Sequence, residues 1–199
     1  MNRSFRETIK NRRSCYDIES SSPVSDALIE GIVDFTLEHM PSAFNSQSTR
    51  LVLLLGEHHK KLWNVVMETL REVVPPDKFA ATEKKVGSFA AGYGTILFYE
   101  DQKIVKDLQS RFPTYADNFP VWAQHTSAMH QLAVWTMLED EGLGASLQHY
   151  NPLIDAKVRE EWSLDPDWLL VAQMPFGAAN KHPNPKEIQP VSARKRVFR

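Results

Sequence analysis

Residues 41–47 read Pro-Ser-Ala-Phe-Asn-Ser-Gln, and this stretch connects a predicted helix to a predicted strand. Ser25 is placed to cap a helix whose apolar stripe ends at this stretch. The continuous apolar run at 51–55 predicts a buried strand. Asn45 and Gln47 each carry hydrogen-bond donors and acceptors, which suit the edge of a flat heterocycle. The alternative is an ordinary helix–strand turn, in which Asn and Ser are common residues.

Outward from this stretch, helical and strand-like segments alternate along the chain. Further helices are predicted at 3–13, 58–73, 77–90, 102–111 and 152–162, and further strands at 95–99, 145–148 and 168–174. The segment 120–141 is apolar around most of its circumference, so it lies at the centre of the domain or of a dimer. The tail from Gly177 is expected to be extended. This order predicts one domain over residues 1–199, with a sheet covered by helices, of α/β or α+β class.

The amino-acid composition limits the classes of partner that the protein is expected to bind. The 199 residues include 23 Lys and Arg and 25 Asp and Glu, for a formal net charge of −2. This balance gives no electrostatic reason to expect nucleic acid or a membrane surface. We see no secretory signal and no apolar run long enough to span a bilayer. The single cysteine, Cys15, suits a reducing compartment, so we expect a cytoplasmic protein.

Two further polar segments are candidate binding sites. Arg12-Arg13-Ser14 follows the first predicted helix, and two guanidinium groups with a hydroxyl suit a phosphate. The alternative is that these cations complement the negative end of that helix. Gln148-His149 follows a predicted strand, a usual place for a ligand, although a solvated loop fits equally well. No metal site is predicted, because His149 has no partner at metal-ligand spacing.

The order of these segments resembles the nitroreductase family of flavoproteins. Within it, the chain resembles the branch that includes the yeast fatty-acid-repression-mutant type and its bacterial relatives. The resemblance rests on the Arg-Arg-Ser segment at 12–14 and on 41–47, and it continues through 88–98, 148–152 and 173–177. It implies an α+β fold with a central mixed or antiparallel sheet flanked by helices and a long central helix. It also implies a homodimer that exchanges its C-terminal tails.

The resemblance further implies two FMN sites, each built from both subunits. The residues that match the family's cofactor-binding segments are Arg12, Arg13, Ser14, Asn45, Gln47, Lys85, Gln148, His149, Arg194 and Arg196. In this branch the tail ends as Arg-x-Lys-Val-Phe. Here residues 194–198 read Arg-Lys-Arg-Val-Phe, which keeps the charge of the third position and changes the residue.

The implied activity is hydride transfer from NADH or NADPH, through flavin N5, to a small nitroaromatic or quinone-like acceptor in ping-pong order. No catalytic side chain is expected, because the flavin carries the chemistry. Candidate pocket-lining aromatics are Phe44, Tyr93, Phe112, Tyr115, Phe119 and Trp122. One alternative is a flavin-binding regulatory or stress-response protein, in lipid signalling or redox homeostasis, with little turnover. Another is a cofactor-free helical interaction module, against which the apolar strands at 51–55 and 168–174 argue.

Overall fold

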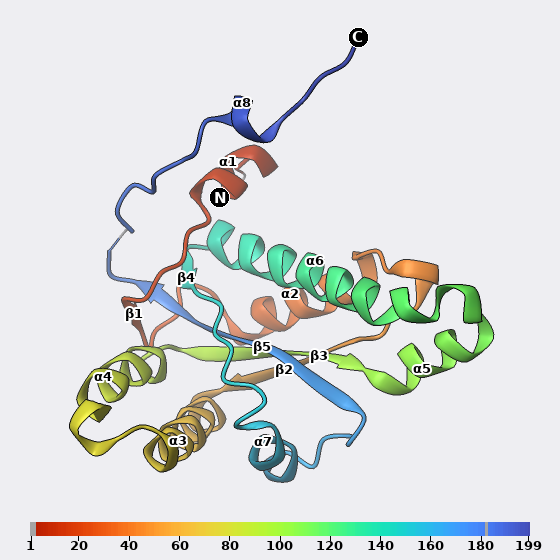
Figure 1. Cartoon of the computed structure of the whole chain (residues 1–199). Coiled ribbons are helices and arrows are strands. Elements are labelled where there is room, and N and C mark those ends of the chain that lie inside the picture. Colours follow the sequence, from red (N-terminus) through yellow and green to blue (C-terminus); the bar gives the residue numbers. More distant parts are fainter. Residues whose placement is uncertain (1–2, 182) are drawn as a thin grey trace.

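The computed structural model describes residues 3–181 and 183–199, and Figure 1 shows its element order. The helices are α1 (Phe5–Asn11), α2 (Asp26–His39), α3 (Gly56–Val73), α4 (Phe79–Ala90), α5 (Gln102–Arg111), α6 (Phe119–Asp140), α7 (Asp155–Glu161) and α8 (Val191–Arg194). Short 3-10 turns are η1 (Ala43–Asn45), η2 (Pro76–Lys78) and η3 (Pro113–Asn118). The strands are β1 (Ile18–Glu19), β2 (Thr49–Leu55), β3 (Gly94–Asp101), β4 (Leu143–Ala145) and β5 (Trp168–Ala179).

The strands form one antiparallel sheet in the order β1-β5-β3-β2, and β4 pairs with β5. Strand β3 lies between β5 and β2, and all eight of its residues are buried. The long helix α6 crosses one face of the sheet (Figure 1). The predicted α+β fold, with a central sheet and a long central helix, is therefore confirmed.

Alternate side chains of β3 build two cores, one on each face of the sheet. Ile96 and Phe98 pack in the cluster that includes residues of α2 and α6. Leu97 and Tyr99 pack in the opposite cluster with residues of α3, α4 and α7. Figure 1 shows these two helical layers above and below the sheet. Because successive strand residues point to opposite faces, one apolar strand can anchor both layers.

Capping residues and prolines account for most helix boundaries. The Ser25 hydroxyl accepts a hydrogen bond from the Leu28 backbone N–H at 3.3 Å at the start of α2. Ser4 and Glu7 form a reciprocal capping box at the start of α1. Pro120 lies in the first turn of α6, where its missing N–H leaves no helical bond unmade. The predicted helices therefore agree with the structure to within a few residues at most ends.

The strand predictions need correction at several ends. β4 covers 143–145 instead of the predicted 145–148, and the two-residue β1 was not predicted. A Cβ at Gly144 would lie 2.9 Å from the Cys15 sulfur, so this strand needs glycine to pack closely. β5 continues through Pro175 to Ala179, where the sequence predicts an extended tail. The Pro175 carbonyl still accepts from the Ser146 N–H, so the missing proline donor does not end the strand.

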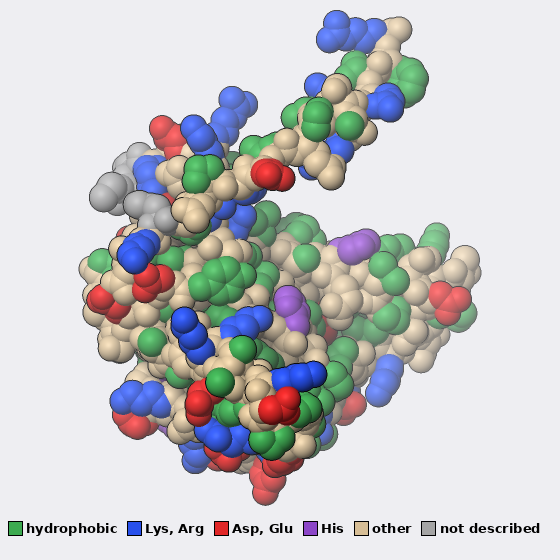
Figure 2. All heavy atoms as spheres, turned by 60° about the vertical axis from the view of Figure 1, so that its left-hand side comes forward, with side chains coloured by type: hydrophobic (Ala, Val, Ile, Leu, Met, Phe, Trp, Pro, Cys, Tyr) green, Lys and Arg blue, Asp and Glu red, His purple; other side chains and the backbone are tan. Residues whose placement is uncertain are grey.

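Beyond β5 the chain leaves the body of the molecule. It passes α1 and ends far from the sheet (Figure 1). Figure 2 shows basic and apolar side chains along this tail, which stands clear of the body. Ile188 is 68% exposed and Phe198 is 92% exposed. Within residues 3–181 and 183–199, no helix has the length and apolar character needed to cross a membrane.

Candidate functional site

The predicted phosphate-binding segment runs beside β4. Ser14 forms an isolated parallel bridge with Ala145, and the Cys15 N–H donates to the Ala145 carbonyl at 2.9 Å. This pairing fixes Arg12 and Arg13 next to the polar loop that follows β4. The backbone pairing therefore brings the arginine segment alongside β4, and its shared role with Gln148 and His149 in one site stays a prediction.

Both guanidinium groups of this segment are available to an anion. Arg12 lies over the Trp135 ring, with its guanidinium carbon 4.2 Å from the ring centroid. Desolvation, followed by the neighbouring charge of Arg13, lowers the pKa of Arg12 from its ordinary value. Arg13 donates to the Asn184 carbonyl at 2.7 Å. In the described chain, the arginines with a carboxylate within 4.0 Å are Arg3, Arg50, Arg71 and Arg111.

A cavity of about 660 Å³ opens at this segment. Four cations and one carboxylate are among its lining residues, which are Arg12, Arg13, Ser14, Cys15, Tyr16, Asp17, Lys181, Pro183, Asn184 and Lys186. The Cys15 side chain is buried, and burial raises the pKa of its thiol, so the thiol is a packing group. The lining therefore carries a surplus of positive charge, which suits an anionic group.

The loop after β4 is held to β5 by Gln173, a fully buried side chain. The backbones of Gln148 and Gln173 exchange hydrogen bonds at 2.8 and 2.9 Å, and the Gln173 side-chain oxygen accepts from Tyr150 N–H at 2.8 Å. Gln148 is buried and donates to the Ser146 hydroxyl at 3.0 Å, whereas His149 is exposed. Sequence reasoning missed Gln173, although a glutamine inside an otherwise apolar strand was a visible signal.

The 41–47 segment contains three non-glycine residues with left-handed backbone. The φ angles are 57° at Phe44, 50° at Asn45 and 48° at Gln47. The Asn45 N–H donates to the Ser42 carbonyl, and the Gln47 N–H donates to the Ser42 hydroxyl, both at 3.0 Å. The side chains of Asn45 and Gln47 are exposed. The backbone N–H groups of Asn45 and Gln47 are therefore bonded within the turn, and their side-chain amides stay exposed to a ligand.

The chain places this turn and the arginine segment in different cavities. Gln47 lines a cavity of about 300 Å³ together with Arg50, His130 and Trp168. Arg12 and Arg13 line the larger cavity described above. The predicted two walls of one site therefore do not meet within a single copy of the chain.

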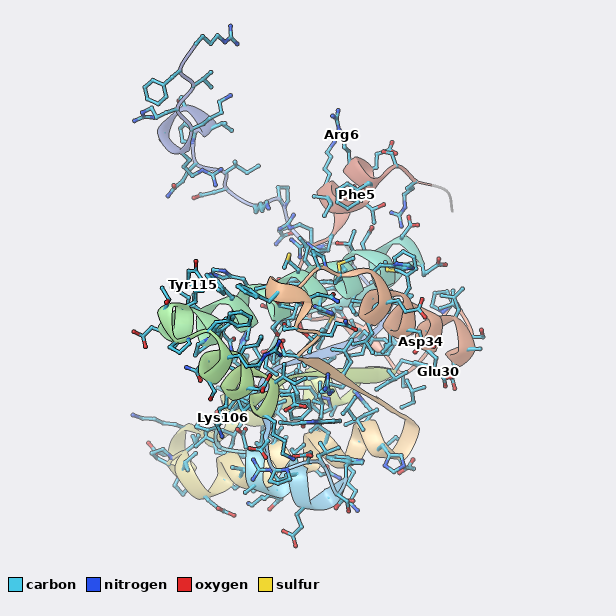
Figure 3. All side chains as sticks on the ribbon, turned by 90° about the vertical axis from the view of Figure 1, so that its right-hand side faces the viewer. Phe5, Arg6, Glu30, Asp34, Lys106 and Tyr115 are labelled. Atoms are coloured by element: carbon cyan, nitrogen blue, oxygen red, sulfur yellow. The ribbon has the colours of Figure 1, made fainter. Side chains whose placement is uncertain are left out.

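An aromatic cluster surrounds Phe44. Its ring lies 4.9 Å from Phe112, 5.3 Å from Phe119, and 6.0 Å from Trp122, with an interplanar angle of 19° to the Trp122 ring. Tyr115 is 6.2 Å away, on the outer edge of the molecule (Figure 3). Beside this cluster is a cavity of about 340 Å³ lined by Ala43, Phe44, Trp122, His125, Thr126 and Met129.

Tyr93 lies apart from this aromatic cluster. Its hydroxyl donates to Asp26, and its ring lies 6.4 Å from Phe176, at the other end of the sheet. Within a single chain, Tyr93 is therefore not part of the cluster around Phe44, and its role in lining a pocket stays a prediction.

The predicted cofactor-binding cations that remain are Lys85, Arg194 and Arg196. Lys85 is exposed on α4, one turn before Phe89, whose ring lies 6.2 Å from the Tyr16 ring beside the arginine segment. Arg194 and Arg196 are exposed on the tail, and Arg196 donates to the carbonyls of Ser192 and Lys195 in the same tail. In the described residues, no group of three or more His, Cys, Asp or Glu could hold a metal ion.

These features define a class of protein. The model of the nitroreductase family matches residues 9–178, which covers the sheet, α6 and both polar segments. The chain belongs to the nitroreductase family.

The chain is also similar to particular proteins and solved structures. HBN1 and the nitroreductase FRM2, both of Saccharomyces cerevisiae, are 33% and 31% identical to the chain over 184 residues, which cover 92% of this chain and 91% of each relative. The nitroreductase CinD from Lactococcus lactis, in complex with chloramphenicol, has a TM-score of 0.89 and 39% identity, over 98% of this chain and 100% of that chain. A Desulfovibrio desulfuricans protein in complex with FMN shares the fold at 15% identity, with a TM-score of 0.72 over 100% of each chain.

Proposed function

We propose that the chain is an FMN-dependent oxidoreductase that takes hydride from NADH or NADPH and delivers it to nitroaromatic or quinone-like acceptors. When bound, FMN supplies the redox chemistry by accepting hydride at N5 and releasing it to the acceptor in ping-pong order. The observation that carries the proposal is the cavity of about 660 Å³ that Arg12 and Arg13 border without an ion-pair partner among the described residues. A phosphate monoester has the charge and geometry to fit two guanidinium groups and the hydroxyl of Ser14.

The side chains have distinct roles in this proposal. Arg12 and Arg13 bind the phosphate, and Ser14 adds a hydroxyl donor. Gln148 and His149 border the ring from the loop that Gln173 fixes. Lys85 supplies a further cation from α4. These residues bind and orient the cofactor, and none of them transfers a proton in this account.

A second copy of the chain completes the site. Asn45 and Gln47 are exposed, and Gln47 lines a different cavity from the arginines, so both amides are suited to meet the ring bound by a partner chain. On α6, Val121 is 51% exposed and Leu132 is 46% exposed, as expected of a face that a second copy covers. The extended tail with Arg194 and Arg196 is suited to exchange between the copies.

The acceptor class follows from the aromatic cluster. Stacked rings around Phe44 and Trp122 suit a small flat molecule, and they offer no surplus charge for a strongly ionic one. CinD has been solved with chloramphenicol and with 4-nitrophenol, so 4-nitrophenol is a suitable first acceptor for this chain.

Variants at the arginine segment test the proposal. Arg12→Ala and Arg13→Ala are expected to weaken FMN binding about tenfold or more, because each removes a charge-assisted hydrogen-bond donor. Arg6→Ala is the matched control, since Arg6 points away from the body on α1 (Figure 3). FMN fluorescence quenching measures the affinities. Equal affinities in all four proteins would reject the phosphate assignment.

Turnover separates the enzyme from a regulatory flavoprotein. NADH or NADPH oxidation is measured with and without 4-nitrophenol or a quinone. Acceptor-dependent oxidation supports the enzyme. Bound FMN with negligible oxidation of either donor, with or without an acceptor, would favour a flavin-binding regulatory or stress-response protein.

A further inference from the structure

The turn that presents Asn45 and Gln47 is conformationally strained. Left-handed φ angles at Phe44 and Gln47 are unfavourable for residues with a β-carbon, while asparagine tolerates them better. Such a conformation persists only where surrounding contacts impose it. The hydrogen bonds to Ser42 lie within the turn, so they do not fix its position against the sheet.

Glu100 on β3 anchors the residues that follow the turn. Its side chain is fully buried, and its two oxygens accept separately from the Ser48 hydroxyl at 2.5 Å and the Thr49 hydroxyl at 2.6 Å. Thr49 is also the register partner of Glu100 in the β2–β3 ladder. A buried carboxylate is costly unless its oxygens are hydrogen-bonded, so this carboxylate strongly favours the backbone position that brings both hydroxyls to it.

Asp101, the next residue on β3, anchors the turn through its backbone and its side chain. The Asp101 N–H donates to the Ser48 carbonyl at 2.8 Å. Its carboxylate pairs with Arg50 at 3.0 Å, and Arg50 donates to the Gln47 carbonyl at 2.8 Å. Two consecutive residues of a rigid central strand therefore fix positions 47, 48 and 49.

The anchor extends to α6 through His130. The His130 Nδ1 lies 2.9 Å from the Thr126 carbonyl, which can only accept, so this nitrogen carries the proton. The same nitrogen lies 3.4 Å from the Thr49 hydroxyl. The hydroxyl hydrogen of Thr49 is therefore left to bond Glu100.

We propose that Glu100 and Asp101 are positioning residues that hold the 44–47 turn in its left-handed conformation and so present the amides of Asn45 and Gln47 to the cofactor. The presentation rests on the proposed function, whereas the holding of the turn does not. We call this pair the Glu100–Asp101 clamp.

Hydrogen exchange in the full chain without FMN tests the clamp itself. In Glu100→Ala, backbone amides in 42–49 are expected to exchange about tenfold faster than in the wild type, because two buried hydroxyls lose their acceptor. Glu100→Gln keeps one oxygen acceptor and gains an amide donor for the other hydroxyl, so its exchange is expected to stay within about threefold. Ser48→Ala, which removes one hydroxyl and keeps the carboxylate, is the milder variant if Glu100→Ala does not fold.

Thr95→Val is the matched control for a loss of stability. It removes a buried hydroxyl near the other end of β3, on the opposite face, where that hydroxyl bonds His59 and Trp63. Faster exchange confined to 42–49 in the Glu100 or Ser48 variants, and absent in Thr95→Val, supports the clamp. Unchanged exchange in both clamp variants, or an equal rise in Thr95→Val, would overturn it.

FMN affinity then tests the link to the cofactor. Glu100→Ala is expected to weaken FMN binding about tenfold, with Glu100→Gln and Thr95→Val within about threefold of the wild type. Equal affinity for Glu100→Ala and the wild type would overturn the presentation of Asn45 and Gln47. If the wild type binds no FMN, the proposed function fails, and the exchange result still decides whether the clamp holds the turn.

Discussion

The two ends of β3 carry two buried polar networks with different consequences. Near the start of the strand, the Trp63 indole N–H donates to the Thr95 hydroxyl at 3.0 Å, and Thr95 lies 2.9 Å from His59 Nδ1. His59 Nε2 lies 3.2 Å from the Ala90 carbonyl. At the end of the strand, the carboxylate of Glu100 holds the polar turn instead.

The Thr95 network therefore stabilises the fold, whereas the Glu100 network positions residues of the candidate site. The Thr95 network is neutral, its members bond one another, and it joins α3 and α4 to the sheet. The Glu100 network is built on an ionisable carboxyl group and fixes a turn whose side-chain amides stay exposed. We therefore expect changes near Thr95 to lower stability without altering ligand affinity, and changes near Glu100 to alter both.

Thr95→Val is expected to give the largest loss of stability. The valine is isosteric but leaves the buried Trp63 N–H and His59 Nδ1 without partners, at a cost of about 2–4 kcal/mol in the free energy of unfolding. Urea unfolding at neutral pH measures this loss. A cost near zero would show that the Thr95 network is not a structural anchor, and the comparison would fail.

The second-largest effect is expected from acidic pH, which weakens the Thr95 network. Burial lowers the pKa of His59 below the 6.5 of the unfolded chain, and its hydrogen bond to Ala90 offsets this in part. The contribution of His59 is thus fully present above pH 6.5 and is lost as pH falls through the folded pKa. Between pH 6.5 and 5 the loss is at most about 2 kcal/mol. Unfolding free energies at both pH values measure it, and His59→Gln should show a smaller decline than the wild type. Parallel declines would contradict this assignment.

The Glu100 network is expected to respond to pH with the opposite sign and the smallest amplitude. Burial raises the pKa of Glu100 above 4.5, although hydrogen bonds from Ser48 and Thr49 partly offset it. Its contribution to stability is therefore full below pH 4.5 and is lost as pH rises through the folded pKa. Glu100→Gln cannot ionise, so its stability relative to the wild type should increase by up to about 1 kcal/mol as pH rises. A relative stability that falls with pH would show that the carboxylate prefers its charged form.

The sequence was sufficient for much of the fold, because local chemistry determines it. Ser25 and the prolines mark helix boundaries, and the apolar run at 51–55 defines a strand. Glu100 and Asp101 were missed because two acidic residues after an apolar run resemble a strand end. The ladder with β2 instead brings Glu100 into register with Thr49, and the Asp101 N–H donates to the Ser48 carbonyl.

The site was predictable only in part, for a related reason. Arg12, Arg13 and Ser14 border a cationic cavity, and Asn45 and Gln47 present exposed amides, but their role in cofactor binding stays a prediction. Their separation into two cavities depends on tertiary packing, which no local pattern specifies. The tail residues Arg194 and Arg196 make no contact with the arginine segment in the described part of one chain, so their role stays a prediction.

Titration of the purified full chain with FMN is the decisive test of the proposed cofactor site. Quenching of flavin fluorescence, with the protein at a concentration well above the dissociation constant, measures the stoichiometry. We expect saturation at one FMN per chain, with affinity reduced in Arg13→Ala and unchanged in Arg6→Ala. A wild-type chain that leaves flavin fluorescence unchanged, and stays colourless after excess FMN is removed, would contradict it.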